Sequence, residues 1–201
     1  MAERHGDAMS LARSLARWRA RARRALRAAV AITTVPRVPP PPPPAPLRPD
    51  ALPSPRIRRA DAVDLDALVA LEERVFSHDR LSRAQFRRHL DSDSALVLIA
   101  KEEGLLLGAA VVFFRRGARV ARLYSLVTAP EARGRGVGAA LLEAAERGAR
   151  ARRCHTLRLE VRIDNRAALR LYETRGYRHL VHRPGYYEDG SDAHRFEKTL
   201  H

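Results

Sequence analysis

Several features of membrane, disulfide-bonded or metal-binding proteins are scarce or missing in this sequence of 201 residues. Its single cysteine, Cys154, rules out a disulfide within the chain and favours a reducing compartment, so we expect a cytoplasmic protein. No apolar run approaches the roughly 18 residues of a membrane-spanning helix, which predicts a soluble protein without a transmembrane segment. No His-Glu-x-x-His or Cys-His spacing occurs, and strand alternation would direct His179 and His182 to opposite faces, so we expect no metal site.

Acidic residues are scarce in the first part of the chain. Residues 1–60 hold 13 arginines and three acids, whereas residues 61–201 hold 25 basic and 20 acidic residues. Within residues 9–30, apolar side chains recur at helical spacing with arginines on the opposite side, which is typical of a basic amphipathic helix. Such a helix would suit an anionic membrane surface, nucleic acid or a targeting role. A solvated, mostly unfolded extension is the simpler interpretation.

Eleven of the 13 prolines fall between Pro36 and Pro55. Because proline fixes its backbone and lacks an amide hydrogen, this stretch is predicted to be an extended linker. We therefore divide the chain into residues 1–55, a disordered or helical basic segment with a proline-rich linker, and residues 56–201, one folded domain.

The folded part alternates strands and helices. Ser82 and Gln85 form a capping box, with Leu81 and Phe86 as its hydrophobic staple, which predicts a helix over residues 83–90. Apolar stripes predict the other helices, after Asp61 or Asp64, from about Val137 and from about Asn165 to Arg175. Apolar and β-branched runs predict the strands, at residues 57–60, 95–100, 105–114, 119–128, 156–161, 177–182 and 194–200. An antiparallel meander followed by one β-α-β unit gives an α/β fold with a mixed sheet.

The most informative stretch is the turn between the strand at 119–128 and the long helix. Pro130 ends the strand, and glycines then alternate with larger residues: Arg133, Gly134, Arg135, Gly136, Val137 and Gly138. The first turn of a helix has unpaired amides, and glycines allow an anion to approach them closely. The pattern predicts a phosphate-binding turn with additional positive charge from two arginines.

This turn resembles the Gln/Arg-x-x-Gly-x-Gly/Ala signature of the GNAT acetyltransferase superfamily. Residues 157–177 resemble the LEVR-x-x-N-x-x-A-x-x-LY-x-x-x-GF/Y block of the ribosomal-protein-alanine (RimI-like) N-acetyltransferases. The resemblance runs from about Arg56 to the C-terminus. It implies the GNAT fold, with a mixed, mostly antiparallel, splayed sheet flanked by helices and with acetyl-CoA between the two strands that separate.

Acetyl-CoA is the cosubstrate that the resemblance implies. The end of one strand would pair with the pantetheine arm, the glycine turn would hold the pyrophosphate, and an asparagine would hydrogen-bond the cofactor. The implied cofactor-binding residues are Leu126, Val127, Thr128, Arg133, Gly134, Arg135, Gly136, Val137, Gly138, Ala139 and Asn165.

Acetyl transfer from a thioester to an amine requires a neutral amine and a proton for the departing thiolate. The resemblance implies that Glu160 is the general base, acting through water, and that Tyr172 is the general acid. Each residue has a plainer interpretation. Glu160 shares a strand face with Arg158 and Arg162 and could belong to a solvated charged stripe, and Tyr172 could be a core tyrosine.

The acceptor is less well defined. The resemblance implies that Tyr186 and Tyr187 lie over the incoming peptide N-terminus, and Tyr124 is a third residue expected to contact the acceptor. Three nearby acids, Glu188, Asp189 and Asp192, would attract a cationic amine. An acidic turn with aromatic packing is an equal alternative. Residues 76–81 lack the Pro-Trp pair that is frequent in the ribosomal enzymes. We therefore expect a primary amine, preferably the α-amine of a peptide or protein N-terminus, with a small-molecule amine as the alternative.

Two functions of another class remain open. Gly134, Gly136 and Ala139 also fit the dinucleotide-binding fingerprint, and Glu160 follows about 20 residues later, where a ribose-binding acid would fall. The proline, the arginines in the turn and the single β-α-β unit argue against that function. The other possibility is a non-catalytic adaptor that binds acyl-CoA, which the presence of both Glu160 and Tyr172 disfavours.

Overall fold

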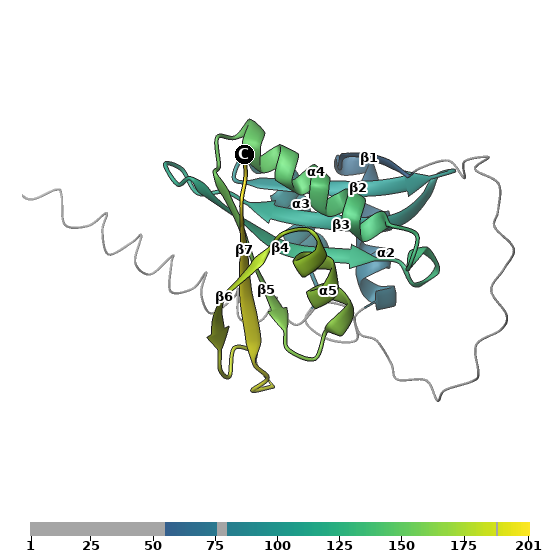
Figure 1. Cartoon of the computed structure of the whole chain (residues 1–201). Coiled ribbons are helices and arrows are strands. Elements are labelled where there is room, and N and C mark those ends of the chain that lie inside the picture. The colour runs from purple at the N-terminus through teal and green to yellow at the C-terminus, as the bar shows by residue number, and fades with distance from the viewer. Residues whose placement is uncertain (1–54, 76–79, 188) are drawn as a thin grey trace, which may run out of the picture.

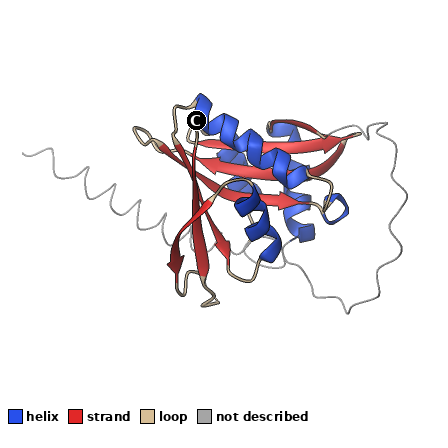
Figure 2. Cartoon of the chain, in the orientation of Figure 1, coloured by secondary structure: helices blue, strands red, loops and turns tan. Residues whose placement is uncertain are grey.

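The computed structural model describes residues 55–75, 80–187 and 189–201, so the basic N-terminal segment lies outside the described residues. The strands are β1 (Arg56–Arg59), β2 (Ala95–Glu102), β3 (Leu105–Phe113), β4 (Val120–Thr128), β5 (Thr156–Arg162), β6 (Arg178–Arg183) and β7 (Ala193–Thr199). The helices are η1 (Ala62–Asp64), α2 (Leu65–Val75), α3 (Arg83–Leu90), η2 (Pro130–Ala132), α4 (Val137–Ala151) and α5 (Arg166–Thr174). The strands form one sheet in the order β1-β2-β3-β4-β5-β7-β6, with α4 and α5 on one face and α2 and α3 on the other (Figure 1, Figure 2).

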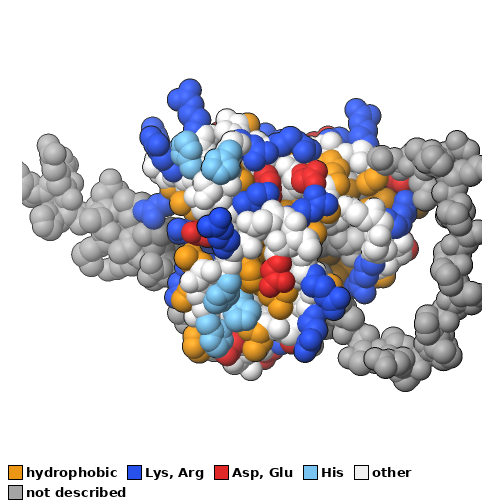
Figure 3. Space-filling model, in the orientation of Figure 1, with side chains coloured by type: hydrophobic (Ala, Val, Ile, Leu, Met, Phe, Trp, Pro, Cys, Tyr) orange, Lys and Arg blue, Asp and Glu red, His pale blue; other side chains and the backbone are white. Residues whose placement is uncertain are grey.

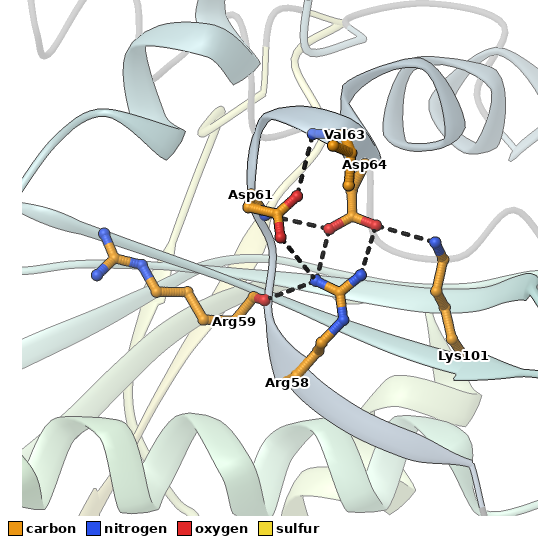
Figure 4. Close-up of polar contacts among 6 residues, drawn as sticks. All are labelled: Arg58, Arg59, Asp61, Val63, Asp64 and Lys101. Carbon is orange, nitrogen blue, oxygen red and sulfur yellow. Dashed lines mark hydrogen bonds and ion pairs between the residues drawn. The ribbon is translucent and has the colours of Figure 1, made fainter.

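A buried carboxylate joins β1, η1 and β2. Asp61 caps η1 by accepting from the Val63 amide, and Asp64 returns the bond by accepting from the Asp61 amide (Figure 4). Asp64 also accepts from Arg58 at 2.7 and 2.8 Å and from Lys101 at 2.9 Å. Burial alone would raise the pKa of Asp64, but these hydrogen bonds hold it well below its usual range. The cluster fixes the first strand to the rest of the sheet.

The start of α3 is as predicted. Ser82 accepts from the Gln85 amide, the Gln85 side chain accepts from the Ser82 amide, and Leu81 and Phe86 are both buried. The amide of Leu81 also donates to the buried carboxyl of Glu72 in α2. Burial raises the pKa of Glu72 to about 7, since a carboxylate is poorly solvated there.

The predicted hairpin also forms. Glu103 and Gly104 have φ angles of 49° and 82°, which is the left-handed geometry of a two-residue turn between β2 and β3. Side chains of β2 and β3 pack with one side of α4 in the hydrophobic core. Its largest fully buried side chains are Phe86, Leu68, Ile99, Leu141, Leu142, Leu157, Leu159, Val97, Val111, Val112, Val137 and Val161.

The centre of the sheet separates into two halves. β4 and β5 run parallel but pair only from Val120 with Thr156 to Arg122 with Arg158. Beyond that point β4 pairs with β3, and β5 pairs with β7, both antiparallel. Among the described strands this is one parallel pair in a mostly antiparallel sheet, which confirms the predicted splayed α/β architecture. A single β-α-β unit, β4-α4-β5, is present in the described part, unlike the stacked units of dinucleotide-binding folds.

The expectation that His179 and His182 point to opposite faces is wrong. The pairing register of β6 with β7 shifts between His179 and Val181, and this irregularity cancels the alternation. As a result His179 Nε2 lies 2.9 Å from His194 Nδ1, and the rings of His182 and His194 are 5.5 Å apart. Even so, no group of three metal-ligating side chains suited to an ion occurs among the described residues.

Cys154 is buried, and that burial raises the pKa of its thiol, which is typical of a small packing residue and not of a nucleophile. Within residues 55–75, 80–187 and 189–201, no helix is long and apolar enough to cross a membrane.

Candidate active site

The glycine turn presents backbone amides at the start of α4. Gly134 and Gly136 have φ angles of 74° and 78°, a region that favours glycine, and a Cβ at either position would meet no other atom within 4 Å. Gly136 is the N-cap of α4, and no side chain caps the helix. The amides of the first turn therefore lack both intrahelical partners and a capping oxygen, which is the arrangement that binds an anion.

Ion pairs hold this turn on two sides. Arg135 Nη2 lies 2.6 Å from Glu102 Oε2 on the β2–β3 hairpin, and Arg74 of α2 bonds both oxygens of Glu131 at 2.7 and 2.6 Å. Arg133 is exposed and forms no ion pair within the described part of the chain. The two arginines of the turn thus differ, because one is already engaged by a carboxylate and the other is available.

The end of β4 lies beside the turn. Leu126 and Val127 are buried, and beyond Arg122 the strand pairs with β3 alone. A Cβ on Gly138 would lie 3.4 Å from Thr128 Oγ1 and 3.6 Å from Leu171 of α5, so the first turn of α4 adjoins both β4 and α5. These groups fit the predicted roles, since a strand with an unpaired side can bond an extended arm and the amides can bond a pyrophosphate.

Asn165 has a role that sequence reasoning did not include. Its side chain is buried and is the N-cap of α5, where Oδ1 accepts from the Ala168 amide at 3.1 Å. This bond orients the helix that carries Tyr172. The bond to the cofactor stays a prediction.

The carboxylate of Glu160 lies between two guanidinium groups. Its Oε2 is 2.7 Å from Arg122 Nη2, and its Oε1 is 2.8 Å from Arg195 Nη2 and 2.9 Å from Arg195 Nε. The Glu160 side chain is only 3% exposed. It therefore does not belong to a solvated stripe, whereas Arg158 and Arg162 on the same strand face pair with other acids.

Tyr172 is buried in α5. Its ring lies 5.7 Å from that of Tyr177 and 6.5 Å from that of Phe196. Burial raises the pKa of Tyr172, so its hydroxyl keeps its proton at neutral pH. The side chain is packed as a core tyrosine would be, and it also holds the proton that a general acid needs.

The structure brings the three predicted acceptor tyrosines together. Tyr124 and Tyr186 pack against a small buried cluster that contains Tyr187 and Ala193. Tyr186 accepts a hydrogen bond from Arg122 at 2.8 Å, and the rings of Tyr186 and Tyr187 are 5.3 Å apart and nearly perpendicular. The buried hydroxyl of Tyr187 has no hydrogen-bond partner among the residues that the structure describes. Such an orphaned hydroxyl is typical of a site completed by water or a ligand.

The nearby acids are already occupied. Asp189 pairs with Arg162 at 2.9 Å. Asp192 bonds His182 and the Gly185 amide, both at 2.8 Å. Their charges are balanced locally, so they offer less attraction for a cationic amine than the sequence suggested, and Glu188 lies outside the described residues.

Sequence reasoning missed Arg122 and Arg195. Arg122 is two residues before Tyr124 on β4, so alternation could have placed both on the acceptor face. Arg195 reaches Glu160 because the two are directly paired between β7 and β5. No local pattern indicates that pairing, which joins residues far apart in the chain.

With this geometry in view, similarity to known proteins identifies the family. Residues 64–177 match the family model described as the acetyltransferase (GNAT) family. This match covers more than half of the chain, and the chain belongs to the GNAT family. The predicted family and its fold are confirmed.

Three proteins illustrate what the chain is similar to. A Methanocaldococcus jannaschii protein described as an uncharacterized N-acetyltransferase is 43% identical over 72 residues, which are 35% of this chain and 46% of that protein. The chain thus spans about half the length of this curated relative. The ribosomal-protein-S18-alanine N-acetyltransferase of Escherichia coli is 28% identical with a TM-score of 0.65, over 73% of this chain and 94% of that one. The ribosomal-protein-alanine N-acetyltransferase of Brucella melitensis is 27% identical with a TM-score of 0.64, over 72% of this chain and 99% of that one.

Proposed function

We propose that this protein transfers the acetyl group of acetyl-CoA to a primary amine, the α-amine at the N-terminus of a peptide or protein. Membership of the GNAT family supports the acetyl transfer. Similarity to two ribosomal-protein-alanine N-acetyltransferases, which are named for a protein substrate, supports the kind of acceptor. The resemblance of residues 157–177 to the block of those enzymes points the same way.

In this proposal the cofactor lies along β4 and the start of α4. The amides that follow Gly136 and the side chain of Arg133 hold the pyrophosphate, and the backbone of residues 126–128 bonds the pantetheine arm. Bound acetyl-CoA supplies the acetyl group as an activated thioester. The open side of β4 beyond Arg122 orients that thioester toward α5.

Two side chains carry the proton transfers, and two tyrosines border the acceptor. Glu160 removes a proton from the acceptor amine through a water molecule, and its bonds to Arg122 and Arg195 fix the position of its carboxylate. Tyr172 donates its proton to the departing sulfur, which its buried, protonated hydroxyl suits. Tyr186 and Tyr187 border the place of the incoming amine.

One observation carries this proposal. Arg122 lies 2.7 Å from Glu160 and donates a hydrogen bond to Tyr186 at 2.8 Å, and the ring of Tyr186 lies 5.3 Å from that of Tyr187. The proposed base on β5 and the acceptor tyrosines before β7 are therefore joined through one side chain of β4. Acetyl transfer requires the base to lie beside the acceptor, whereas a non-catalytic adaptor would not need this arrangement.

Mass spectrometry of a peptide panel tests the proposal. The full-length protein and acetyl-CoA are incubated with peptides that carry a free α-amine, with the same peptides blocked at the N-terminus but containing lysine, and with a polyamine and an amino sugar. We expect acetylation of the free α-amine alone. Acetylation of only the small amines or of lysine would contradict the peptide assignment, and no acetylation of any of them would contradict the activity.

A further inference from the structure

A second positive region lies at the end of the sheet away from the glycine turn. Six arginines gather where the β3–β4 loop meets the turn after α4, and we call this set the arginine end: Arg115, Arg116, Arg119, Arg150, Arg152 and Arg153. The two segments contact directly, because Arg119 O accepts from the His155 amide at 2.7 Å and the Arg152 guanidinium lies 4.2 Å from the centre of the Phe114 ring. Figure 1 shows both segments at the left end of the sheet, and Figure 3 shows basic side chains on that side.

The charge of the arginine end is not balanced by the protein. Within the described part of the chain, none of the six arginines forms an ion pair, and five of them are exposed. The acids on the adjoining helix are engaged elsewhere, since Glu143 pairs with Arg175 and Glu146 with Lys198. The charge of Asp93 reaches Arg152, but Arg59 opposes it. Clustered like charges repel one another, so the region is arranged for an external anion.

Arg153 has an unusual backbone conformation. Its φ angle is 59°, in the left-handed region that closes the C-terminus of α4, and the Cys154 amide bonds back to Ala149 O at 3.0 Å. Glycine is the favoured residue at this position because other residues are strained there. The Arg153 side chain is exposed and forms no hydrogen bond or ion pair with the described residues that would offset that strain. Strain kept at one position without a packing reason indicates that the side chain is needed for function.

The composition of the surface limits what binds it. The exposed large apolar side chains of the described residues all lie elsewhere: Val63, Leu105, Ile163, Leu180 and Val181. Membrane-binding surfaces insert apolar side chains, and stable protein interfaces bury an apolar centre. A phosphodiester backbone requires only positive charge and hydrogen-bond donors. The 15 residues of α4 span about 22 Å, so the arginine end is also remote from the proposed pyrophosphate site.

We infer that the arginine end binds the phosphodiester backbone of a nucleic acid. Guanidinium groups from two adjoining segments contact successive phosphates without reading bases. The stacked guanidinium of Arg152 is already ordered on Phe114, so less conformational freedom is lost when it binds. This surface is separate from the proposed acetyl-transfer site and does not depend on it.

The test compares two variants of equal charge in the full-length protein, because residues 1–55 are also arginine-rich and can bind polyanions. The first is Arg115→Gln with Arg116→Gln and Arg153→Gln. The matched control replaces three exposed arginines away from the arginine end, Arg56→Gln at the start of β1 with Arg166→Gln and Arg170→Gln in α5. Fluorescence anisotropy measures binding of a labelled single-stranded RNA of mixed sequence, and of a DNA of the same sequence, over a series of salt concentrations.

Relative to the control, we expect the first variant to lose about tenfold or more in affinity and its slope of log K against log salt to fall by about 2. The RNA and DNA arms identify which nucleic acid loses more. Equal affinities and slopes for the two variants would overturn the proposal. It would also be overturned if the difference appeared only with anionic lipid vesicles or an acidic peptide.

Arg153→Gly separates function from structure. Glycine relieves the left-handed strain, so we expect a higher melting temperature together with weaker nucleic-acid binding. A purely structural role for Arg153 predicts unchanged binding at whatever melting temperature results, and that outcome would remove Arg153 from the proposed surface.

Discussion

The glycine turn before α4 and the cluster around Glu160 are built in different ways. The turn presents backbone amides, and its geometry comes from glycines a few residues apart in the sequence. The cluster is made of side chains whose partners lie on different strands, since Arg122 bonds Tyr186 across 64 positions and Arg195 bonds Glu160 across 35. The glycine turn, which we call the cofactor half of the candidate site, is therefore a local structure. The cluster around Glu160, which we call the acceptor half, exists only when the sheet has formed.

This difference predicts how each half responds to substitution. Backbone amides cannot be removed by changing a side chain, so the cofactor half should tolerate most replacements other than those at its left-handed glycines. The acceptor half should fail when a single partner is removed, because buried charged groups then lose their compensation.

The largest effect is expected at Tyr172, whose hydroxyl takes part in the proposed chemical step. Tyr172→Phe removes the proposed proton donor but keeps the packing against Tyr177 and Phe196. We expect kcat for acetyl transfer to fall by about 10²- to 10⁴-fold while calorimetric titration shows unchanged CoA affinity. Glu160→Gln should likewise retain CoA binding and lose turnover. Full turnover in both variants would remove the catalytic roles, and a parallel loss of CoA affinity would mean that the halves are not separable.

A smaller effect is expected when the acceptor network loses one cation. Arg122→Gln takes a partner from both Glu160 and Tyr186. We expect the free energy of unfolding in urea to fall by about 3 kcal/mol. Arg158→Gln is the matched control, because Arg158 lies beside Arg122 in the sheet but its pair with Glu197 is partly exposed, and it should cost at most about 1 kcal/mol. Equal losses in the two variants would show that burial of the network does not matter.

The acceptor half also depends on α3, and this dependence should vary with pH. Ring contacts lead from His89 of α3 through Phe113 to Tyr124, and Glu72 holds the start of α3 through the Leu81 amide. The folded state binds the Glu72 proton more tightly than the unfolded chain, in which the pKa is near 4.5, so stability should fall as pH rises from about 4.5 to about 7.

Glu72→Gln keeps an acceptor for the amide but cannot ionise. We expect it to match the parent protein at pH 4 and to be more stable by up to about 3 kcal/mol at pH 8. Glu73→Gln, an exposed neighbour, is the control and should leave the pH dependence unchanged. Thermal unfolding curves that shift in parallel for both variants at every pH would contradict this role for Glu72.

The same contrast explains how much the sequence could predict. The capping box of α3, the β2–β3 hairpin and the glycine turn depend on residues close together in the chain, so periodicity and turn chemistry were sufficient for each. The arginines around Glu160 and the register shift in β6 depend on which strands pair and in which register. Register is set by the packing of the whole sheet, and no short pattern contains it. Family resemblance supplied Glu160 and Tyr172, but it gave no indication of Arg122 or Arg195.

The smallest effect is expected within the glycine turn, where two neighbouring glycines should respond in opposite directions. Gly136→Ala forces a side chain into φ of 78°, which should cost about 1 kcal/mol of unfolding free energy and lower CoA affinity by disturbing the first amides of α4. Gly138→Ala lies inside the helix, where its Cβ would make ordinary contacts at 3.4 Å or more, so it should be neutral or slightly stabilising. Chemical denaturation and calorimetric titration of both variants measure this. If Gly138→Ala weakens CoA binding as much as Gly136→Ala, the site depends on close approach along the whole first turn and not on the left-handed turn before it.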